Sequence, residues 1–219
     1  MKEKTVFIGT YTKKEGHVDG KAKGIYTLYQ NPETGALRFG ETVAKITNPS
    51  YVLETEDGKN LYAVSELTEK DAASGFIYSY KISENDSLTE IGKISTEGFA
   101  PCHIAIGKKG NYVFVSNYVG GVVVMYERKN DGTLVKKQQL DFENPKISHP
   151  HSVSISADNK TVYIADLGND KIWIYNFDAE KGMLSPHEQV YIALEKGSGP
   201  RHLAFSKNND FVYSVNELN

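Results

Sequence analysis

Short apolar runs alternate with polar turns along the whole chain of 219 residues. The runs are rich in Val, Ile, Tyr and Phe and are bounded by Gly, Asn and Asp, which is typical of β-strands. No stretch keeps an apolar period of 3.6 residues for the three or so turns of a helix. The pattern therefore predicts an all-β protein built from antiparallel hairpins. Clear examples of these runs are LYAVSEL (61–67), YVFVSNY (112–118) and VYIADLG (162–168).

Four prolines mark a repeat in this pattern. Pro49, Pro101, Pro150 and Pro200 are separated by 52, 49 and 50 residues, and each begins a strand, a polar turn and a second strand. Third strands such as FIYSYKI, VVVMYER and IWIYNF follow, each with a turn and then a leucine. A period of roughly 50 residues with about four strands is typical of a β-propeller blade. A β-sandwich also has short strands at regular spacing, but it does not require such a repeat.

The count of units sets the expected domain organisation. About four blades are present and are offset by two strands, because residues 5–12 match a second strand and residues 211–218 match a second strand with no third after it. We expect residues 1–219 to form a single β-propeller domain, the N-terminal part of a longer chain. The alternative is a closed ring of four blades, in which residues 24–37 supply the outer strands of the last blade.

Composition excludes several classes of partner. A net charge of -3 and a pI near 6.1 provide no basic surface for nucleic acid. No apolar run approaches the roughly 18 residues of a membrane span, so we expect no membrane association. With Cys102 as the single cysteine, no intrachain disulfide can form, which indicates the reducing cytoplasm. The oligomeric state is not determined by the sequence.

The repeat predicts which residues meet. The first strand of each blade lines the central channel of a propeller, so equivalent positions on successive blades face one another. Three such positions hold small, polar or ionisable groups. They are the residue after the proline (Ser50, Cys102, His151, Arg201), the next residue (Tyr51, His103, Ser152, His202) and the end of the second strand (Glu66, Asn117, Asp166, Glu217).

Three of these residues have the chemistry of an acid-base site. His151 can exchange a proton near neutral pH, Glu217 can orient it or relay a proton, and Arg201 can bind an anionic group through paired hydrogen bonds. We predict that they are catalytic. The alternative is structural, with turn carbonyls bonded by His and Arg and with ion pairs between blades. The expected substrate-binding residues are His103, Asn117, Asp166 and His202.

Metal binding and thiol chemistry are less consistent with the sequence. His149 and His151 have the spacing that places two side chains on one face of a strand, yet no zinc pattern is present. The segment 166–170 lacks the spacing of a calcium loop. We predict no metal site. Cys102 is expected to be a packing residue, because the adjacent His103 would point to the opposite face of the strand.

Several motifs resemble a known family, the seven-bladed propeller lactonases. This family includes propeller-type bacterial 6-phosphogluconolactonases and fungal carboxymuconate-lactonizing enzymes. The resemblance implies a seven-bladed fold and a histidine, an arginine and a glutamate as active residues, at the positions of His151, Arg201 and Glu217. The matching motifs are GTYT (9–12), NPSY (48–51), PCH (101–103), SNYVGG (116–121), PHS (150–152), ADLG (165–168), GSGPRH (197–202) and NEL (216–218).

The expected activity follows from this resemblance and from the three residue types. We expect hydrolysis of a sugar-acid lactone, 6-phosphogluconolactone in particular, without a cofactor. A muconate-type cycloisomerase would use the same site in the ring-closing direction. A propeller that binds a carbohydrate or a protein without catalysis is the third alternative.

Overall fold

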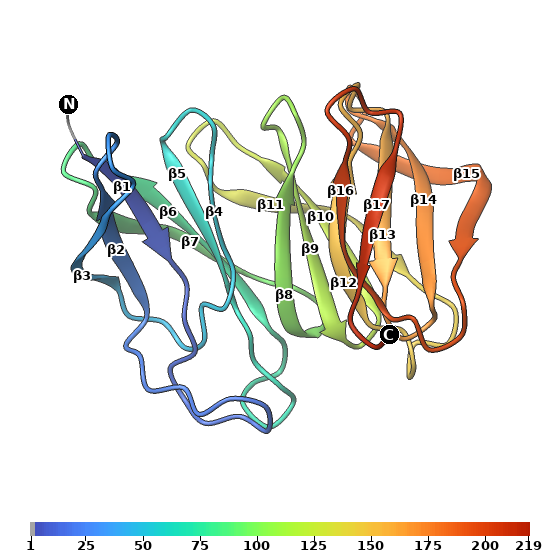
Figure 1. Ribbon diagram of the computed structural model, residues 1–219, viewed down its shortest axis with the longest axis horizontal. Helices are drawn as coiled ribbons and strands as arrows, with labels where there is room; N and C mark the ends of the chain where they lie inside the picture. The colour runs from blue at the N-terminus through green and yellow to red at the C-terminus, as the bar shows by residue number, and fades with distance from the viewer. Residues whose placement is uncertain (1–2) are drawn as a thin grey trace.

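Seventeen antiparallel β-strands in five sheets make up residues 3–219, the part of the chain that the computed structural model describes (Figure 1). The first sheet contains β1 (Lys4–Ile8), β2 (Ile25–Gln30) and β3 (Leu37–Ala44). The second contains β4 (Val52–Glu54), β5 (Asn60–Ser65), β6 (Phe76–Ile82) and β7 (Leu88–Ser95). The third contains β8 (Phe99–Ile106), β9 (Tyr112–Val119), β10 (Val122–Arg128) and β11 (Leu134–Asp141). The fourth contains β12 (Pro150–Ile155), β13 (Thr161–Asp166), β14 (Lys171–Asp178) and β15 (Met183–Ala193), and the fifth contains β16 (Pro200–Phe205) and β17 (Val212–Asn216).

The sheets follow one another in chain order, as the blades of a propeller do (Figure 1). Within each sheet, every strand pairs with its neighbours in sequence, which confirms the predicted four-stranded meander and its offset of two strands. Five successive sheets exclude the two-sheet sandwich. The closed four-blade ring is also wrong for this structure, because β16 and β17 pair only with each other and β1–β3 form a sheet of their own. Residues 3–219 include no helix with the length and apolar character needed to cross a membrane.

One turn conformation repeats between the first and second strands. In each of the last four sheets, a residue with a positive φ closes the turn: Gly58 (65°), Gly110 (72°), Asn159 (61°) and Asn209 (60°). Each donates its backbone N–H to the carbonyl oxygen three residues earlier. Gly and Asn tolerate this left-handed conformation better than other residues do. The polar turns of the sequence repeat are therefore one structural element, repeated four times.

The hydrophobic core lies between the sheets. Three clusters of buried side chains each join two successive sheets, and the largest fully buried members include Tyr62 on β5, Phe114 on β9 and Ile164 on β13. The central strands of the second, third and fourth sheets are buried on both faces, because each of these sheets packs against a neighbour on either side. This packing holds the strand ends, where the functional groups lie, in fixed positions.

Candidate active site

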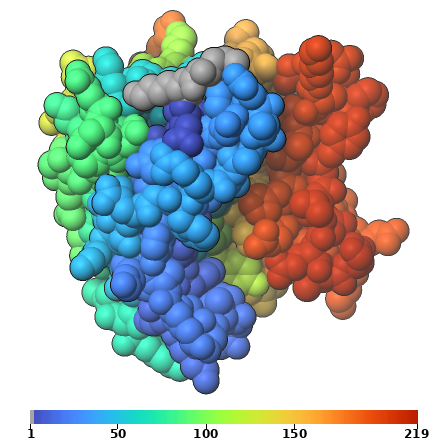
Figure 2. All heavy atoms as spheres, turned by 60° about the vertical axis from the view of Figure 1, so that its left-hand side comes forward, coloured from blue at the N-terminus to red at the C-terminus, as the bar shows by residue number. Residues whose placement is uncertain are grey.

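A cavity of about 780 Å³ opens where the first strands begin and the second strands end. This is the lower end of the sheets in Figure 1, and in Figure 2 the N-terminal sheet and the C-terminal strands lie on either side of a hollow in the surface. Four successive sheets contribute to the lining of this cavity at the start of their first strands, and one repeated position lines the cavity in all four. The residues at this position are Ser50, Cys102, His151 and Arg201, the set that follows the repeated prolines.

A β-bulge directs three of these side chains. Pro101 pairs with Asn117 and His103 pairs with Ser116, so the intervening Cys102 has no partner of its own. The same shift occurs at His151 on β12 and at Arg201 on β16. A bulge inserts one extra residue into a strand and changes the direction of its side chain, and bulges are common beside active sites. Proline provides no N–H for the ladder at this point.

Arg201 and Glu217 form an ion pair in the cavity wall. Arg201 Nε donates a hydrogen bond to Glu217 Oε2 at 2.7 Å. The two side chains are 44% and 42% exposed, so both remain accessible to a ligand. The carboxylate orients the guanidinium. The other N–H groups of the guanidinium have no hydrogen-bond acceptor within residues 3–219.

His151 is buried next to this pair. The residue is 7% exposed, and Nδ1 has no hydrogen-bond partner among residues 3–219. Its ring centroid lies 5.1 Å from that of His202, which also lines the cavity. Burial, the charge of Arg201 and the neighbouring His202 lower the pKa of His151 to about 3. The imidazole is therefore neutral at physiological pH and has one unprotonated nitrogen.

His103 lies behind the cavity wall. Its ring packs against those of Tyr51 at 4.6 Å and His202 at 5.5 Å, and its Nδ1 accepts a long hydrogen bond of 3.4 Å from the N–H of Val153. Burial is the main reason that its pKa falls to about 3, with His202 and His151 adding to the effect. His103 does not line the cavity, and its ring packs behind that of His202, which does.

Asn117 and Asp166 lie outside the cavity lining, contrary to the position expected for substrate-binding residues. Both are completely buried. Asn117 Nδ2 donates to the carbonyl oxygen of Thr96. Asp166 accepts hydrogen bonds from Ser148 Oγ, the His149 backbone N–H, Trp173 Nε1 and Asn169 Nδ2, between 2.7 and 3.0 Å. Its carboxylate fixes the segment that leads into His151.

Tyr118 is a lining residue that the sequence interpretation missed. Its ring stacks on His149 at 4.5 Å and meets the ring of His151 edge-on at 5.8 Å.

The spacing from the repeated proline distinguishes buried residues from lining residues. Asn117 and Asp166 are 16 residues after their prolines, whereas Glu66 and Glu217 are 17 residues after theirs. Successive strand residues point to opposite faces, so this difference of one residue separates buried groups from lining groups. A constant spacing of 17 would have identified Tyr118.

The surroundings of Cys102 and His149 disfavour thiol chemistry and metal binding. The sulfur of Cys102 lies 3.4 Å from the carbonyl oxygen of His151, and burial raises the pKa of its thiol, which disfavours the reactive thiolate. His149 Nδ1 forms a hydrogen bond of 2.6 Å with the carbonyl oxygen of Tyr118. Within residues 3–219, no three His, Cys, Asp or Glu side chains are grouped as a metal site requires.

Known proteins with similar sequences include enzymes named for lactone hydrolysis. The chain is 29% identical to a 6-phosphogluconolactonase of Bacillus subtilis, over 97% of this chain and 59% of the relative. It is 30% identical to a 6-phosphogluconolactonase of Formosa agariphila, over 97% of this chain and 61% of the relative. The chain thus spans about three fifths of the length of these relatives.

Solved structures have the same fold. A periplasmic gluconolactonase of Pseudomonas aeruginosa superposes with a TM-score of 0.86 at 27% identity, covering 98% of this chain and 61% of that one. A protein from Lactobacillus plantarum gives a TM-score of 0.84 at 27% identity, over 99% of this chain and 60% of that one. The family described as "Lactonase, 7-bladed beta-propeller" matches residues 5–219. The chain belongs to this lactonase family of seven-bladed β-propellers.

Proposed function

We propose that the protein hydrolyses a sugar-acid lactone, 6-phosphogluconolactone, to the open-chain acid, with His151, Arg201 and Glu217 as the catalytic residues. The observation that carries this proposal is the convergence of a neutral imidazole and a guanidinium–carboxylate pair on one cavity, from two successive sheets. The names of the two curated relatives support the choice of substrate.

In this mechanism, His151 acts as the general base. Its neutral imidazole accepts a proton from a water molecule as the water oxygen attacks the lactone carbonyl carbon. The low pKa of His151 weakens it as a base in the free enzyme. The negative charge that develops on the carbonyl oxygen lies nearby and stabilises the imidazolium, which offsets this weakness. The imidazolium then returns the proton to the ring oxygen as the carbon–oxygen bond breaks.

Arg201 stabilises the oxyanion of the tetrahedral intermediate. Charged donors that are already oriented toward a developing negative charge provide much of the rate enhancement in acyl transfer. Glu217 holds the guanidinium through Nε, which leaves the terminal N–H groups for the substrate. Every step uses groups of this chain and water, and no cofactor takes part.

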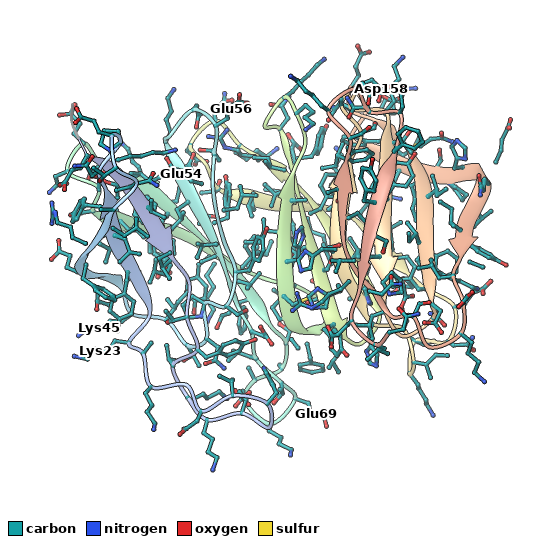
Figure 3. The ribbon with its side chains drawn as sticks, viewed as in Figure 1. Lys23, Lys45, Glu54, Glu56, Glu69 and Asp158 are labelled. Atoms are coloured by element: carbon teal, nitrogen blue, oxygen red, sulfur yellow. The ribbon has the colours of Figure 1, made fainter. Side chains whose placement is uncertain are left out.

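The test is lactonase turnover by the full-length protein with 6-phosphogluconolactone. We expect Arg201→Ala, Glu217→Gln and His151→Ala each to lower kcat/KM, by roughly 100-fold or more for Arg201→Ala. Glu56→Gln is a matched control, since Glu56 lies in the turn at the opposite end of the sheets (Figure 3). Undiminished rates in the Arg201 and Glu217 variants would refute these roles. Parallel assays with a muconolactone distinguish the cycloisomerase reaction.

We also propose a cytoplasmic location. The single cysteine, Cys102, is the observation in its favour, because no intrachain disulfide can contribute to stability. Fractionation of cells that express the protein, with antibody detection, checks this proposal.

A further inference from the structure

A second carboxylate, that of Glu66, lines the cavity three sheets away from Arg201. Glu66 follows the last residue of β5 as Glu217 follows the last residue of β17. The backbone N–H of each donates to the carbonyl oxygen of the residue before the repeated proline, Asn48 at 3.0 Å and Gly199 at 2.8 Å. Glu66 and Glu217 therefore occupy equivalent places in two blades, and both line the cavity.

The two carboxylates differ in their partners. Glu217 pairs with Arg201, the residue after its proline, but the residue after Pro49 is Ser50. Glu66 Oε2 instead accepts a hydrogen bond of 2.9 Å from the hydroxyl group of Tyr11. Within residues 3–219, neither a lysine nor an arginine forms an ion pair with Glu66, and Oε1 has no donor. This oxygen remains free to accept a hydrogen bond from a ligand.

Tyr11 is held so that it remains a donor. Its ring contacts the ring of His17 edge-on at 5.3 Å, and both residues line the cavity. Burial, together with the adjacent Glu66 carboxylate, raises the pKa of Tyr11, so that the hydroxyl group stays protonated. The Tyr11 hydroxyl thus fixes one oxygen of Glu66, a residue that lines the cavity, and leaves the other without a donor among residues 3–219.

The charged residues of the cavity lining determine which ligand groups can bind next to Glu66. Glu15, Glu66 and Glu217 are the carboxylates of the lining that the structure describes, and Arg201 is its one permanent cation. Glu15 is already engaged with Lys13 and with Asn48 Nδ2 at 2.7 Å. A phosphate placed against Glu66 would face an uncompensated like charge. Hydroxyl groups have the complementary chemistry, because a carboxylate is a strong acceptor for O–H donors.

We propose that Glu66, oriented by Tyr11, is a substrate-binding residue that accepts hydrogen bonds from the hydroxyl groups of the sugar lactone. This inference rests on the proposed function for the identity of the ligand. The phosphate of the lactone then points away from Glu66, and the carbonyl group lies toward Arg201 and His151. Glu66 thereby selects for a hydroxylated, uncharged portion of the substrate.

The test compares binding of matched ligands without turnover. The ligands are the lactam analogue of 6-phosphogluconolactone and its counterparts that each lack one ring hydroxyl group, and calorimetry gives the dissociation constants for the full-length protein. We expect at least one deoxy counterpart to bind the unsubstituted protein roughly 10- to 100-fold more weakly than the parent lactam, the range for a hydrogen bond to a charged group. This penalty is the ratio of the dissociation constants of the deoxy and parent lactams. In Glu66→Ala the ratio should fall to about threefold or less.

Two further variants keep the test decisive. Glu66→Gln retains the size and one acceptor oxygen but removes the charge, so it should reduce the same penalty partially while the fold is preserved. Glu56→Gln removes a carboxylate from the other end of the same sheet and should leave the penalty unchanged (Figure 3). A penalty that is the same in Glu66→Ala as in the unsubstituted protein, or no penalty for any deoxy ligand, overturns the proposal.

The outcomes separate this inference from the proposed function. Lactone hydrolysis with no effect of Glu66 on the deoxy penalty refutes the Glu66 subsite alone. A penalty that depends on Glu66, found in a protein that hydrolyses no lactone, refutes the catalytic proposal and leaves a lactone-binding propeller. Absence of measurable binding of the parent lactam, in a protein that hydrolyses the lactone, counts against the subsite.

Discussion

Arg201 Nε lies 2.7 Å from Glu217 Oε2, and the two residues come from the beginning of one strand and the end of its neighbour in the same sheet. The bulge at Arg201 turns its side chain into the cavity, where the side chain of Glu217 also lies. Because both side chains are more than two-fifths exposed, this ion pair contributes little to stability. Its position in the cavity points to a functional role.

Arg201→Lys should separate charge from geometry. Lysine keeps the positive charge but lacks the planar fork that can bond Glu217 and an oxyanion together. We expect kcat to fall by roughly 10- to 100-fold, whereas the free energy of unfolding should change by less than about 1 kcal/mol. Steady-state kinetics and urea unfolding measure the two quantities. A variant with full kcat would show that charge alone is sufficient.

The pH dependence of activity should reflect the low pKa of His151. A histidine with its ordinary pKa near 6.5 would lose its function as a base between about pH 7 and 6. Since the pKa of His151 is lowered to about 3, kcat/KM should show no acid limb from this residue above about pH 5. The check is kcat/KM between pH 5 and 8, with circular dichroism to establish that the protein stays folded. A decline centred near pH 6.5 would contradict the assignment.

His103 should make stability decrease in acid. Its pKa is about 3 in the folded protein, below the value near 6.5 expected when unfolded, so between these values the unfolded state binds one more proton. The free energy of unfolding should therefore fall as the pH is lowered through this window, by at most about 1.4 kcal/mol per unit for this group. In His103→Gln the slope between pH 6.5 and 5 should be shallower, as urea titrations at each pH would show.

Asp166→Ala should be strongly destabilising. The substitution removes the acceptor of two buried donors, Ser148 Oγ and Trp173 Nε1. It also removes the acceptor of two partly buried donors, the His149 N–H and Asn169 Nδ2. We expect a loss of about 2–4 kcal/mol in the free energy of unfolding, measured in urea. Asp158→Ala is the control, because Asp158 lies in the exposed turn at the far end of the same sheet (Figure 3) and should cost under about 1 kcal/mol. Equal effects would refute a structural role specific to Asp166.

The sequence by itself determined the blade architecture and indicated several of the side chains that line the cavity. Strand periodicity, the prolines about 50 residues apart and the Gly or Asn of each turn are local features, and they depend only on residue type and spacing. The same repeat placed His151 and Arg201 at the start of a first strand and Glu217 at the end of a second strand, and the structure brings these three to one cavity. Of the expected substrate-binding residues, His202 lines the cavity, whereas His103, Asn117 and Asp166 do not.

Only the tertiary structure decided which face each strand-end residue occupies. A shift of one residue reverses the direction of a side chain, and a bulge adds such a shift without a signature in composition. Tyr118 therefore lines the cavity while its neighbour Asn117 is buried, and both Arg201 and His202 reach the same space. The pairing of Glu66 with Tyr11 also required the fold, since 55 residues separate the two in sequence and they follow strands of different sheets. Side-chain direction depends on hydrogen-bond register across strands, which is fixed when the strands pair and the sheets pack.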